Sequence, residues 1–193
     1  MIQIKSADNE SELLGILTLQ EANLFQHLDE EEKAQQGFVT VKHSLDQLSA
    51  MNDLEAHVIA KDGDQIAGYI LAMTKASRAQ IPVLVPMFEQ FDQLFFLNKP
   101  ISEFHYLVIG QICVGKDYRG QGLFDRMYAA YKANFAGNYE FAITEIATSN
   151  IRSMAAHRRV GFKTIHTFSD SLQEWNIVLW DWANPSGRSE KDS

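Results

Sequence analysis

The stretch from Phe104 to Phe135 constrains the fold more than any other part of this sequence. It holds an apolar run, Phe104 to Val114, then the loop KDYRGQG, and then a stripe of apolar residues at helical spacing that begins at Leu123. A long apolar run of this kind predicts a central strand that is buried on both faces. A strand that passes through a glycine loop directly into a helix leaves the first helical amides unpaired and pointing out of the loop. The order of strand, glycine loop and helix therefore predicts an α/β fold with an amide-lined turn.

The glycine loop is suited to an anion, and a diphosphate is the natural ligand. Gly120 and Gly122 let the backbone approach a phosphate without a Cβ in the way, the helix dipole favours negative charge, and Arg119 adds a positive charge. Such turns also occur for purely structural reasons, so the surrounding sequence must decide whether this turn binds a ligand. A dinucleotide fingerprint would need glycine where the chain has Asp125, and a P-loop would need Gly-Lys followed by Ser or Thr. Both nucleotide motifs are therefore disfavoured.

The rest of the chain predicts further strands and helices on either side of this unit. The pair Asp62-Gly63 between two apolar runs predicts a hairpin, because Asp-Gly accepts the positive φ angles of a tight two-residue turn. Residues Ser6 to Asn9 and Asn150 are placed to cap helices, and Gly161 is placed to end the second of these. The predicted strands are Ile2–Lys5, His57–Ala60, Gln65–Met73, Phe104–Val114, Phe141–Ala147, Phe162–Phe168 and Glu174–Trp182, of which the last two form an antiparallel pair.

Two further segments are predicted to be helical. Residues between Asp29 and Met51 suggest two short helices that form a lip over a cleft. The segment from Ser77 to Pro100 is interpreted as a helical insertion, because Phe88, Phe91 and Phe95 recur at helical spacing. This aromatic stripe fits the core, which is the default at such spacing, and it also fits an acceptor pocket or a homodimer face.

Composition sets the class of protein and weakens the case for some partners. With 193 residues, of which 46% are hydrophobic, the chain can bury the core of a single domain, 1–183, followed by a polar tail, 184–193. A formal net charge of −8 without a basic cluster argues against nucleic acid or an anionic membrane. The single cysteine, Cys113, excludes an internal disulfide, and the histidines lack metal-ligand spacing, so no metal is predicted. The start MIQIKSADNE lacks the features of a secretory signal, which predicts a cytoplasmic protein.

Two motifs together resemble the GNAT family of acetyl-CoA-dependent N-acetyltransferases. The family signature is Arg/Gln-x-x-Gly-x-Gly/Ala between a strand and a helix. Here RGQGLF matches it at Arg119 and Gly122, whereas Phe124 replaces the last small residue. Downstream, the segment NIRSMAAHRRVGF resembles the family's helix that opens with an Asn, here Asn150, and ends in Gly-Phe. The order of the predicted elements is similar to the family's over most of the chain, and the segment 77–100 is extra.

The resemblance implies both a fold and a site for acetyl-CoA as co-substrate. The fold would be a mixed, mostly antiparallel α/β sheet with flanking helices, in which the adjacent parallel strands 104–114 and 141–147 splay apart. The pantetheine arm would enter this gap as a false strand and bond to the backbone of Ile112, Cys113 and Val114. Asn150 and Ser153 would lie beside the cofactor on the following helix. The pyrophosphate would be held by amides of Arg119, Gly120, Gln121, Gly122, Leu123 and Phe124.

The resemblance also implies two proton movements, because an alkylammonium with a pKa of about 10 must lose a proton and the departing thiolate benefits from gaining one. His157 stands where many relatives have a Tyr as proton donor. It is a candidate acid or a residue that packs beside the cofactor. Relatives often carry the base on the first of the two splayed strands, which here has no carboxylate. Glu145 lies on the second splayed strand, where the alternate residues are apolar, and it is the candidate base. The alternatives are that Glu145 is merely a solvated carboxylate at the sheet edge, or that water relays the proton to bulk solvent.

These observations predict an enzyme that moves an acetyl group from acetyl-CoA directly to a primary amine of a small molecule or peptide. Cys113, at the end of an apolar strand, fits a small core residue better than a nucleophile. The alternative is a non-catalytic acyl-CoA-binding or regulatory module, favoured by the missing carboxylate, by His157 and by Phe124. A longer acyl donor is a further alternative. Likeness of fold does not specify the acceptor.

Overall fold

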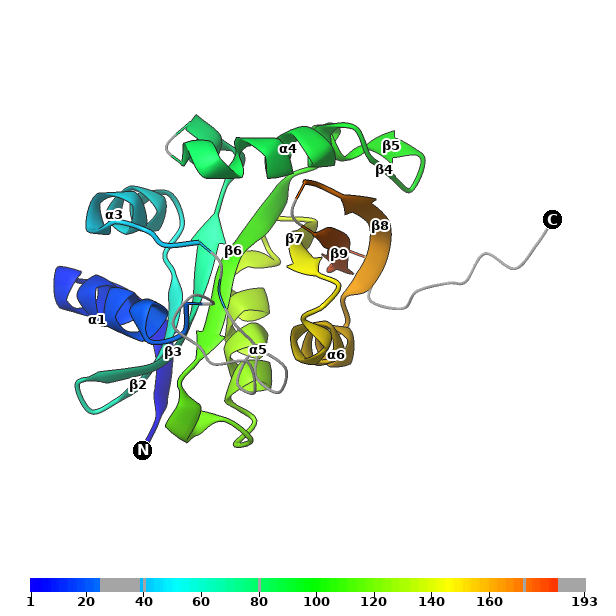
Figure 1. Cartoon of the computed structure of the whole chain (residues 1–193). Helices are drawn as coiled ribbons and strands as arrows, with labels where there is room; N and C mark the ends of the chain where they lie inside the picture. The colour runs from blue at the N-terminus through cyan, green and yellow to red at the C-terminus, as the bar shows by residue number, and fades with distance from the viewer. Residues whose placement is uncertain (25–38, 40, 80, 172, 184–193) are drawn as a thin grey trace.

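The computed structural model describes residues 1–24, 39, 41–79, 81–171 and 173–183, and its centre is one mixed seven-stranded sheet (Figure 1). The strand order is β1-β2-β3-β6-β7-β9-β8, and every neighbouring pair is antiparallel except β6 and β7. This confirms the predicted sheet. The strands are β1 (Gln3–Ser6), β2 (Val58–Asp62), β3 (Gln65–Met73), β6 (Tyr106–Val114), β7 (Phe141–Ala147), β8 (Lys163–Ser169) and β9 (Glu174–Asp181).

The parallel strands β6 and β7 part from each other midway along the sheet. They pair only over Tyr106–Val108 and Phe141–Ile143, although both strands continue and are fully described. The register between β3 and β6 skips Gly110, which makes a bulge on β6 at the point of parting. A bulge bends the strand that carries it and increases its local twist. Just past the paired region, the Thr144 hydroxyl donates to the Ile109 carbonyl at 2.9 Å. The predicted splay of the two parallel strands is thus present.

Helices cover both faces of the sheet and bury two separate apolar clusters (Figure 1). Along β6, Tyr106 and Val108 belong to one cluster and Leu107 and Ile109 to the other, as the alternation of side chains in a strand requires. The first cluster is covered by α1 (Glu10–Glu21), α3 (Leu45–Leu54) and α4 (Val85–Asp92), and the second by α5 (Leu123–Phe135) and α6 (Ile151–Val160).

Local signals in the sequence predicted several of these elements correctly. Asn9 and Asn150 cap α1 and α6 with their side chains. The β2–β3 turn lies one residue later than predicted, at Gly63 and Asp64, because Asp62 still pairs with Gln65. Of the two short helices expected between Asp29 and Met51, α3 is present and packs on the first cluster, while 29–38 and 40 lie outside the described residues, so the expected lip stays a prediction. Across the described ranges, no helix has the length and apolar character needed to cross a bilayer.

The insertion between 77 and 100 is only partly helical. Short 3-10 turns at Lys75–Ala79 and Pro82–Leu84 precede α4, and β4 (Phe95–Phe96) pairs with β5 (Lys99–Pro100). The prediction of one helix through Phe95 is wrong, because Leu97 and Asn98 adopt φ of +49° and +60° and reverse the chain. Phe88 and Phe91 are buried on α4, whereas Phe95 is 67% exposed. The aromatic stripe is therefore divided between the core and a surface hairpin.

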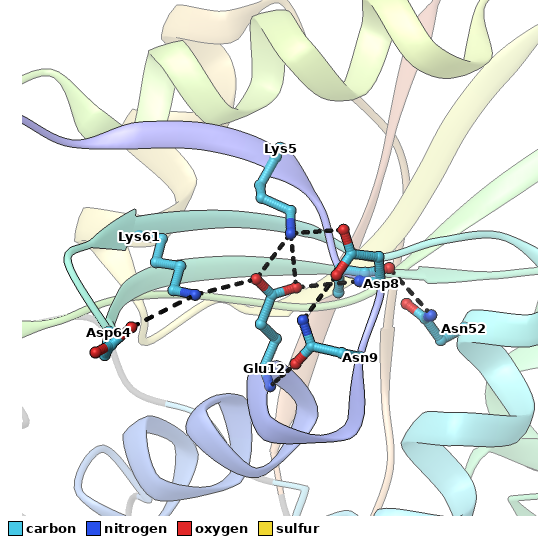
Figure 2. Close-up of polar contacts among 8 residues, drawn as sticks. Lys5, Asp8, Asn9, Glu12, Asn52, Lys61 and Asp64 are labelled. Carbon is cyan, nitrogen blue, oxygen red and sulfur yellow. Dashed lines mark hydrogen bonds and ion pairs between the residues drawn. The ribbon is translucent and has the colours of Figure 1, made fainter.

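A cluster of ion pairs fastens α1 to the β1 edge of the sheet (Figure 2). The Glu12 carboxylate, only 3% exposed, accepts from Lys5 Nζ at 2.8 Å, from Lys61 Nζ at 3.3 Å and from the Asp8 amide at 3.1 Å. Burial raises the pKa of Glu12, but these hydrogen bonds outweigh it and hold that pKa below its usual range. A buried charge of this kind is stable only while its partners are present.

Candidate active site

The turn between β6 and α5 offers backbone amides to an anion. Gly120 and Gly122 adopt φ of +74° and +70°, and a Cβ on either would meet no described atom within 4 Å. Glycine is therefore required here by backbone conformation rather than by close packing. Helix α5 begins at Leu123, directly after Gly122, which has no side chain to cap it. The amides of the first helical turn are left for a ligand, as the sequence predicts.

A cavity of about 510 Å³ opens beside this turn. Its walls are the end of β6, the turn itself, the start of α5 and one face of α6. Gln121 is not among the lining residues, and its Nε2 donates back to the Asp117 carbonyl at 3.0 Å. The other residues predicted to bind the cofactor all line the cavity: Ile112, Cys113, Val114, Arg119, Gly120, Gly122, Leu123, Phe124, Asn150 and Ser153.

Helix α6 contributes lining residues that the sequence reasoning missed. Arg152, Ala155, Ala156 and Arg159 lie on its cavity side, at the three- and four-residue spacing of one helix face. Arg159 forms a bidentate ion pair with Asp125 in the first turn of α5, with Nε–Oδ1 and Nη2–Oδ2 distances of 3.0 and 2.9 Å. Small alanines leave room for a ligand beside the arginines. The three- and four-residue spacing of these side chains after the capping Asn150 was the signal in the sequence that could have identified them as lining residues.

The Arg119 guanidinium is directed toward protein groups as well as toward the cavity. Its Nε donates to the Val114 carbonyl at 3.1 Å, and its Nη2 donates to Asn23 Oδ1 at 2.6 Å. The Asn23 carbonyl in turn accepts the Val39 amide at 3.2 Å. Arg119 therefore braces the glycine turn against the end of α1, while its charge remains at the cavity wall.

A smaller cavity of about 100 Å³ occupies the gap between the splayed strands. It shares Val39, Ile112, Asn150 and Ser153 with the larger cavity, so the two meet at the gap. The rest of its lining comes from Val41, from both strands, from α6 and from β9, and it includes Gln111, Thr144, Glu145, Ile146, His157 and Trp175. The gap thus brings together both predicted catalytic residues, Glu145 and His157.

Glu145 has the environment expected of a proton acceptor. It lies on the same face of β7 as Phe141 and Ile143, and its Oε2 is buried without a hydrogen-bond partner among the described residues. Burial, together with the negative charge of Asp170, raises the pKa of Glu145 to about 7. A carboxylate with this pKa is available both to take and to release a proton near neutral pH.

His157 does not have the environment expected of a proton donor. Its Nδ1 lies 2.8 Å from the Ser153 carbonyl, which can only accept, so Nδ1 carries the hydrogen. Its Nε2 then accepts from the Tyr128 hydroxyl at 2.7 Å. The side chain is 2% exposed, and burial lowers its pKa to about 4. His157 is therefore neutral at pH 7 with both ring nitrogens engaged, and the expected acid role does not fit this geometry.

Cys113 has the environment expected of a core residue. Its thiol is free and buried, and burial raises its pKa to about 12, so the reactive thiolate does not form near neutral pH. In the described part of the chain, no three His, Cys, Asp or Glu side chains are grouped as metal ligands would be. The chemistry that this site can perform therefore centres on Glu145 and on backbone groups.

Comparison with known proteins identifies the family. The model of the acetyltransferase (GNAT) family matches residues 18–162, which include the glycine turn, the splayed strands and α6. The chain belongs to the GNAT family. This GNAT protein is an acetyltransferase, that is, an acyltransferase that uses acetyl-CoA. No curated protein matches the chain.

Solved structures share the fold at low sequence identity. The ribosomal-protein-S18-alanine N-acetyltransferase of Escherichia coli is 13% identical with a TM-score of 0.61, covering 100% of this chain and 99% of its own. The yncA protein of Salmonella typhimurium, solved with its cofactor acetyl-CoA, is 11% identical with a TM-score of 0.61, covering 100% and 99%. A spermidine N-acetyltransferase chimera from Vibrio cholerae is 11% identical with a TM-score of 0.58, covering 97% and 99%. Likeness at this level establishes the fold and leaves the acceptor open.

Proposed function

We propose that this GNAT enzyme transfers the acetyl group of acetyl-CoA directly to a primary amine bound in the gap between β6 and β7. Glu145 accepts the proton that the incoming alkylammonium must lose. The observation that carries the proposal is the position of Glu145. It lines the smaller cavity, which joins the larger one, and its buried Oε2 has no hydrogen-bond partner among the described residues. A near-neutral carboxylate is suited to general-base catalysis at physiological pH.

The unpaired part of β6 supports this placement of acetyl-CoA. Beyond Val108, the edge of β6 that faces β7 has lost its partner strand, so an extended pantetheine arm can bond to the backbone of Ile112, Cys113 and Val114. The pyrophosphate then lies at the amides of the glycine turn and of the start of α5, with Arg119 beside it. A backbone amide in the gap polarises the thioester carbonyl as negative charge develops on its oxygen.

The residues in the gap favour a single direct displacement. Glu145 takes one proton from the ammonium, the amine nitrogen forms a bond to the acetyl carbon, and the carbon–sulfur bond breaks. As the carbon–sulfur bond breaks, the nitrogen loses its second proton to solvent and becomes the amide, and the leaving CoA thiolate takes up one proton from solvent. The Ser153 hydroxyl, which lines both cavities, can donate a hydrogen bond to this thiolate. Because the Cys113 thiol stays protonated, an acetyl-cysteine intermediate is disfavoured. We assign His157 a positioning role, since it holds Ser153 through its backbone carbonyl.

The proposal is tested by calorimetry with acetyl-CoA and by release of free CoA thiol with n-butylamine, spermidine, L-lysine and alanine amide. We expect saturable binding of acetyl-CoA and turnover with at least one of these amines. Binding without turnover on any amine would favour a non-catalytic acyl-CoA-binding module. Well-folded protein that gives no heat with acetyl-CoA or CoA would contradict the cofactor site itself.

A further inference from the structure

Two glutamines, the buried Gln20 and the half-buried Gln111, join the end of α1 to the centre of the gap. Gln20 is 1% exposed, and its Nε2 lies 2.7 Å from Gln111 Oε1 and 2.9 Å from His43 Nδ1, while its Oε1 accepts the His43 amide at 2.8 Å. Gln111 follows the bulge on β6, and its Nε2 donates to the Val41 carbonyl at 2.8 Å. The Tyr69 hydroxyl donates to Gln111 Oε1 at 2.6 Å.

The chemistry of these groups fixes the direction of every hydrogen bond. The His43 amide can only donate, so the atom of Gln20 that faces it must be the carbonyl oxygen. Both Nε2 hydrogens of Gln20 then go to His43 Nδ1 and to Gln111 Oε1. The Val41 carbonyl can only accept, so Gln111 must face it with its amide nitrogen. A carboxylate in place of either glutamine would lose a donor that the network requires.

The network holds a piece of backbone that forms a wall of the smaller cavity. We call Val41–His43 the wall segment. Its Val41 carbonyl and its His43 amide are the backbone groups that the two glutamines bind. Val41 and Gln111 both line the cavity that contains Glu145. Gln20 does not line either cavity, so it reaches the site only through these residues.

Burying the Gln20 amide is costly, because each polar atom left unpaired costs free energy that an apolar side chain would not. The side-chain amides of both glutamines are hydrogen-bonded, although His43 Nε2 is buried without a partner among the described residues. Amides bonded in this way specify one geometry more strictly than apolar packing. Here that geometry is the distance between the wall segment and β6, and with it the width of the gap in front of Glu145.

We propose that Gln20 is a positioning residue for the acceptor amine, acting through Gln111 and the wall segment. This inference rests on the proposed acyl transfer in the gap. It predicts that loss of the Gln20 bonds impairs use of the amine and spares acetyl-CoA. Within the described part of the chain, Gln20 forms no hydrogen bond with the residues of the glycine turn and of α6 that line the larger cavity.

The decisive variant is Gln20→Met, which keeps the length of the side chain and removes all of its hydrogen bonds. With the fastest amine of the panel above, we expect KM for the amine to rise about tenfold, the effect of losing one buried hydrogen bond. The dissociation constant for acetyl-CoA, measured by calorimetry, should stay as in the unmodified enzyme. Hydrogen exchange at the His43 amide should accelerate, because Gln20 Oε1 is its acceptor.

Asn52→Asp is the matched control. The Asn52 amide is also part-buried, donating to the Ala7 carbonyl at 3.3 Å and accepting the His57 amide at 2.9 Å, and it lines neither cavity. Both variants remove the donor of a side-chain amide and leave the carbonyl that it faces without this bond, so an effect of a lost amide donor in general would appear in both. We expect Asn52→Asp to leave both KM for the amine and exchange at His43 unchanged.

A second comparison tests the route through Gln111. If Gln20 acts through Gln111, the double variant Gln20→Met with Gln111→Met should raise KM for the amine little more than Gln111→Met alone. If Gln20→Met does not fold, Gln20→Glu, which keeps the acceptor for the His43 amide and loses both donors, replaces it in the two KM comparisons. The criterion of exchange at His43 applies to Gln20→Met alone, because Gln20→Glu is expected to leave that exchange unchanged.

The outcomes separate this inference from the proposed function. An unmodified enzyme that turns over no amine in the panel contradicts the proposed function, and the inference fails with it. An active enzyme whose Gln20 variant keeps its amine KM, or weakens acetyl-CoA and amine alike, contradicts the inference alone. Unchanged exchange at His43, or an equal effect of Asn52→Asp, overturns it as well.

Discussion

Replacing Glu145 with Gln should change the shape of the pH profile as well as the rate. Burial and the charge of Asp170 raise the pKa of Glu145 to about 7, so the free enzyme is about half ionised at pH 7 and roughly one-tenth ionised at pH 6. Between pH 5 and 8, an alkylamine with a pKa of about 10 stays almost entirely protonated, so its own ionisation adds no break there. For the unmodified enzyme, kcat/KM for the amine should therefore rise about tenfold per pH unit up to a break near pH 7 and then level off.

In Glu145→Gln the break should disappear. Without the carboxylate, only the small fraction of free amine can react, and that fraction grows about tenfold per pH unit throughout this range. We expect kcat/KM to climb steadily from pH 5 to 8. At pH 7 it should lie about a hundredfold to ten-thousandfold below that of the unmodified enzyme, the usual contribution of a general base.

The assay is continuous detection of CoA thiol at subsaturating amine and saturating acetyl-CoA, with calorimetry showing that acetyl-CoA still binds. Glu10→Gln, which alters an exposed carboxylate in the first turn of α1, is the control and should retain the break. A break near pH 7 that persists in Glu145→Gln, or an unmodified enzyme without one, would show that another group accepts the proton.

Three further predictions concern stability and the assignment of His157. Glu12→Gln should lower the free energy of unfolding at pH 7 by roughly 1–3 kcal/mol in urea titrations. Because the pKa of Glu12 is lowered in the folded state, the difference in stability between the variant and the unmodified protein should vanish as the pH falls below that pKa. Gly161 has a φ of +123°, and a Cβ at this position would lie 2.8 Å from Trp180 Nε1, whereas a Cβ at Gly63 would meet open space. Gly161→Ala should therefore lower Tm several times more than Gly63→Ala. His157→Gln should leave the break near pH 7 in place, since burial lowers the pKa of His157 to about 4.

The parts of this fold that the sequence predicted are those set by neighbouring residues. The apolar run of β6, the glycine turn and the first turn of α5 are continuous in the chain, so each could be identified from its own pattern. Asn150 and Gly161 marked the two ends of α6 for the same reason. The β4–β5 hairpin was missed because its turn residues, Leu97 and Asn98, include no glycine to signal positive φ.

The parts that could not be predicted depend on contacts between distant residues. His157 is held by Tyr128, which lies on another helix, and this contact turns a candidate acid into a neutral, enclosed group. Gln20 and Gln111 are 91 positions apart, and nothing in either local pattern indicates that they meet. The pKa of Glu145 was expected to rise with burial, but the contribution of Asp170, 25 positions later in the chain, depends on the tertiary fold.

The parting of β6 and β7 leaves a gap lined by residues from both faces of the sheet. The larger cavity lies toward α5 and α6, whereas Glu145 shares its face of β7 with the cluster beneath α1, α3 and α4. In the proposed mechanism, acetyl donor and acceptor would therefore approach the reacting carbon from different sides. Such an arrangement favours simultaneous occupancy, and initial rates measured against both reactants should give intersecting rather than parallel double-reciprocal lines.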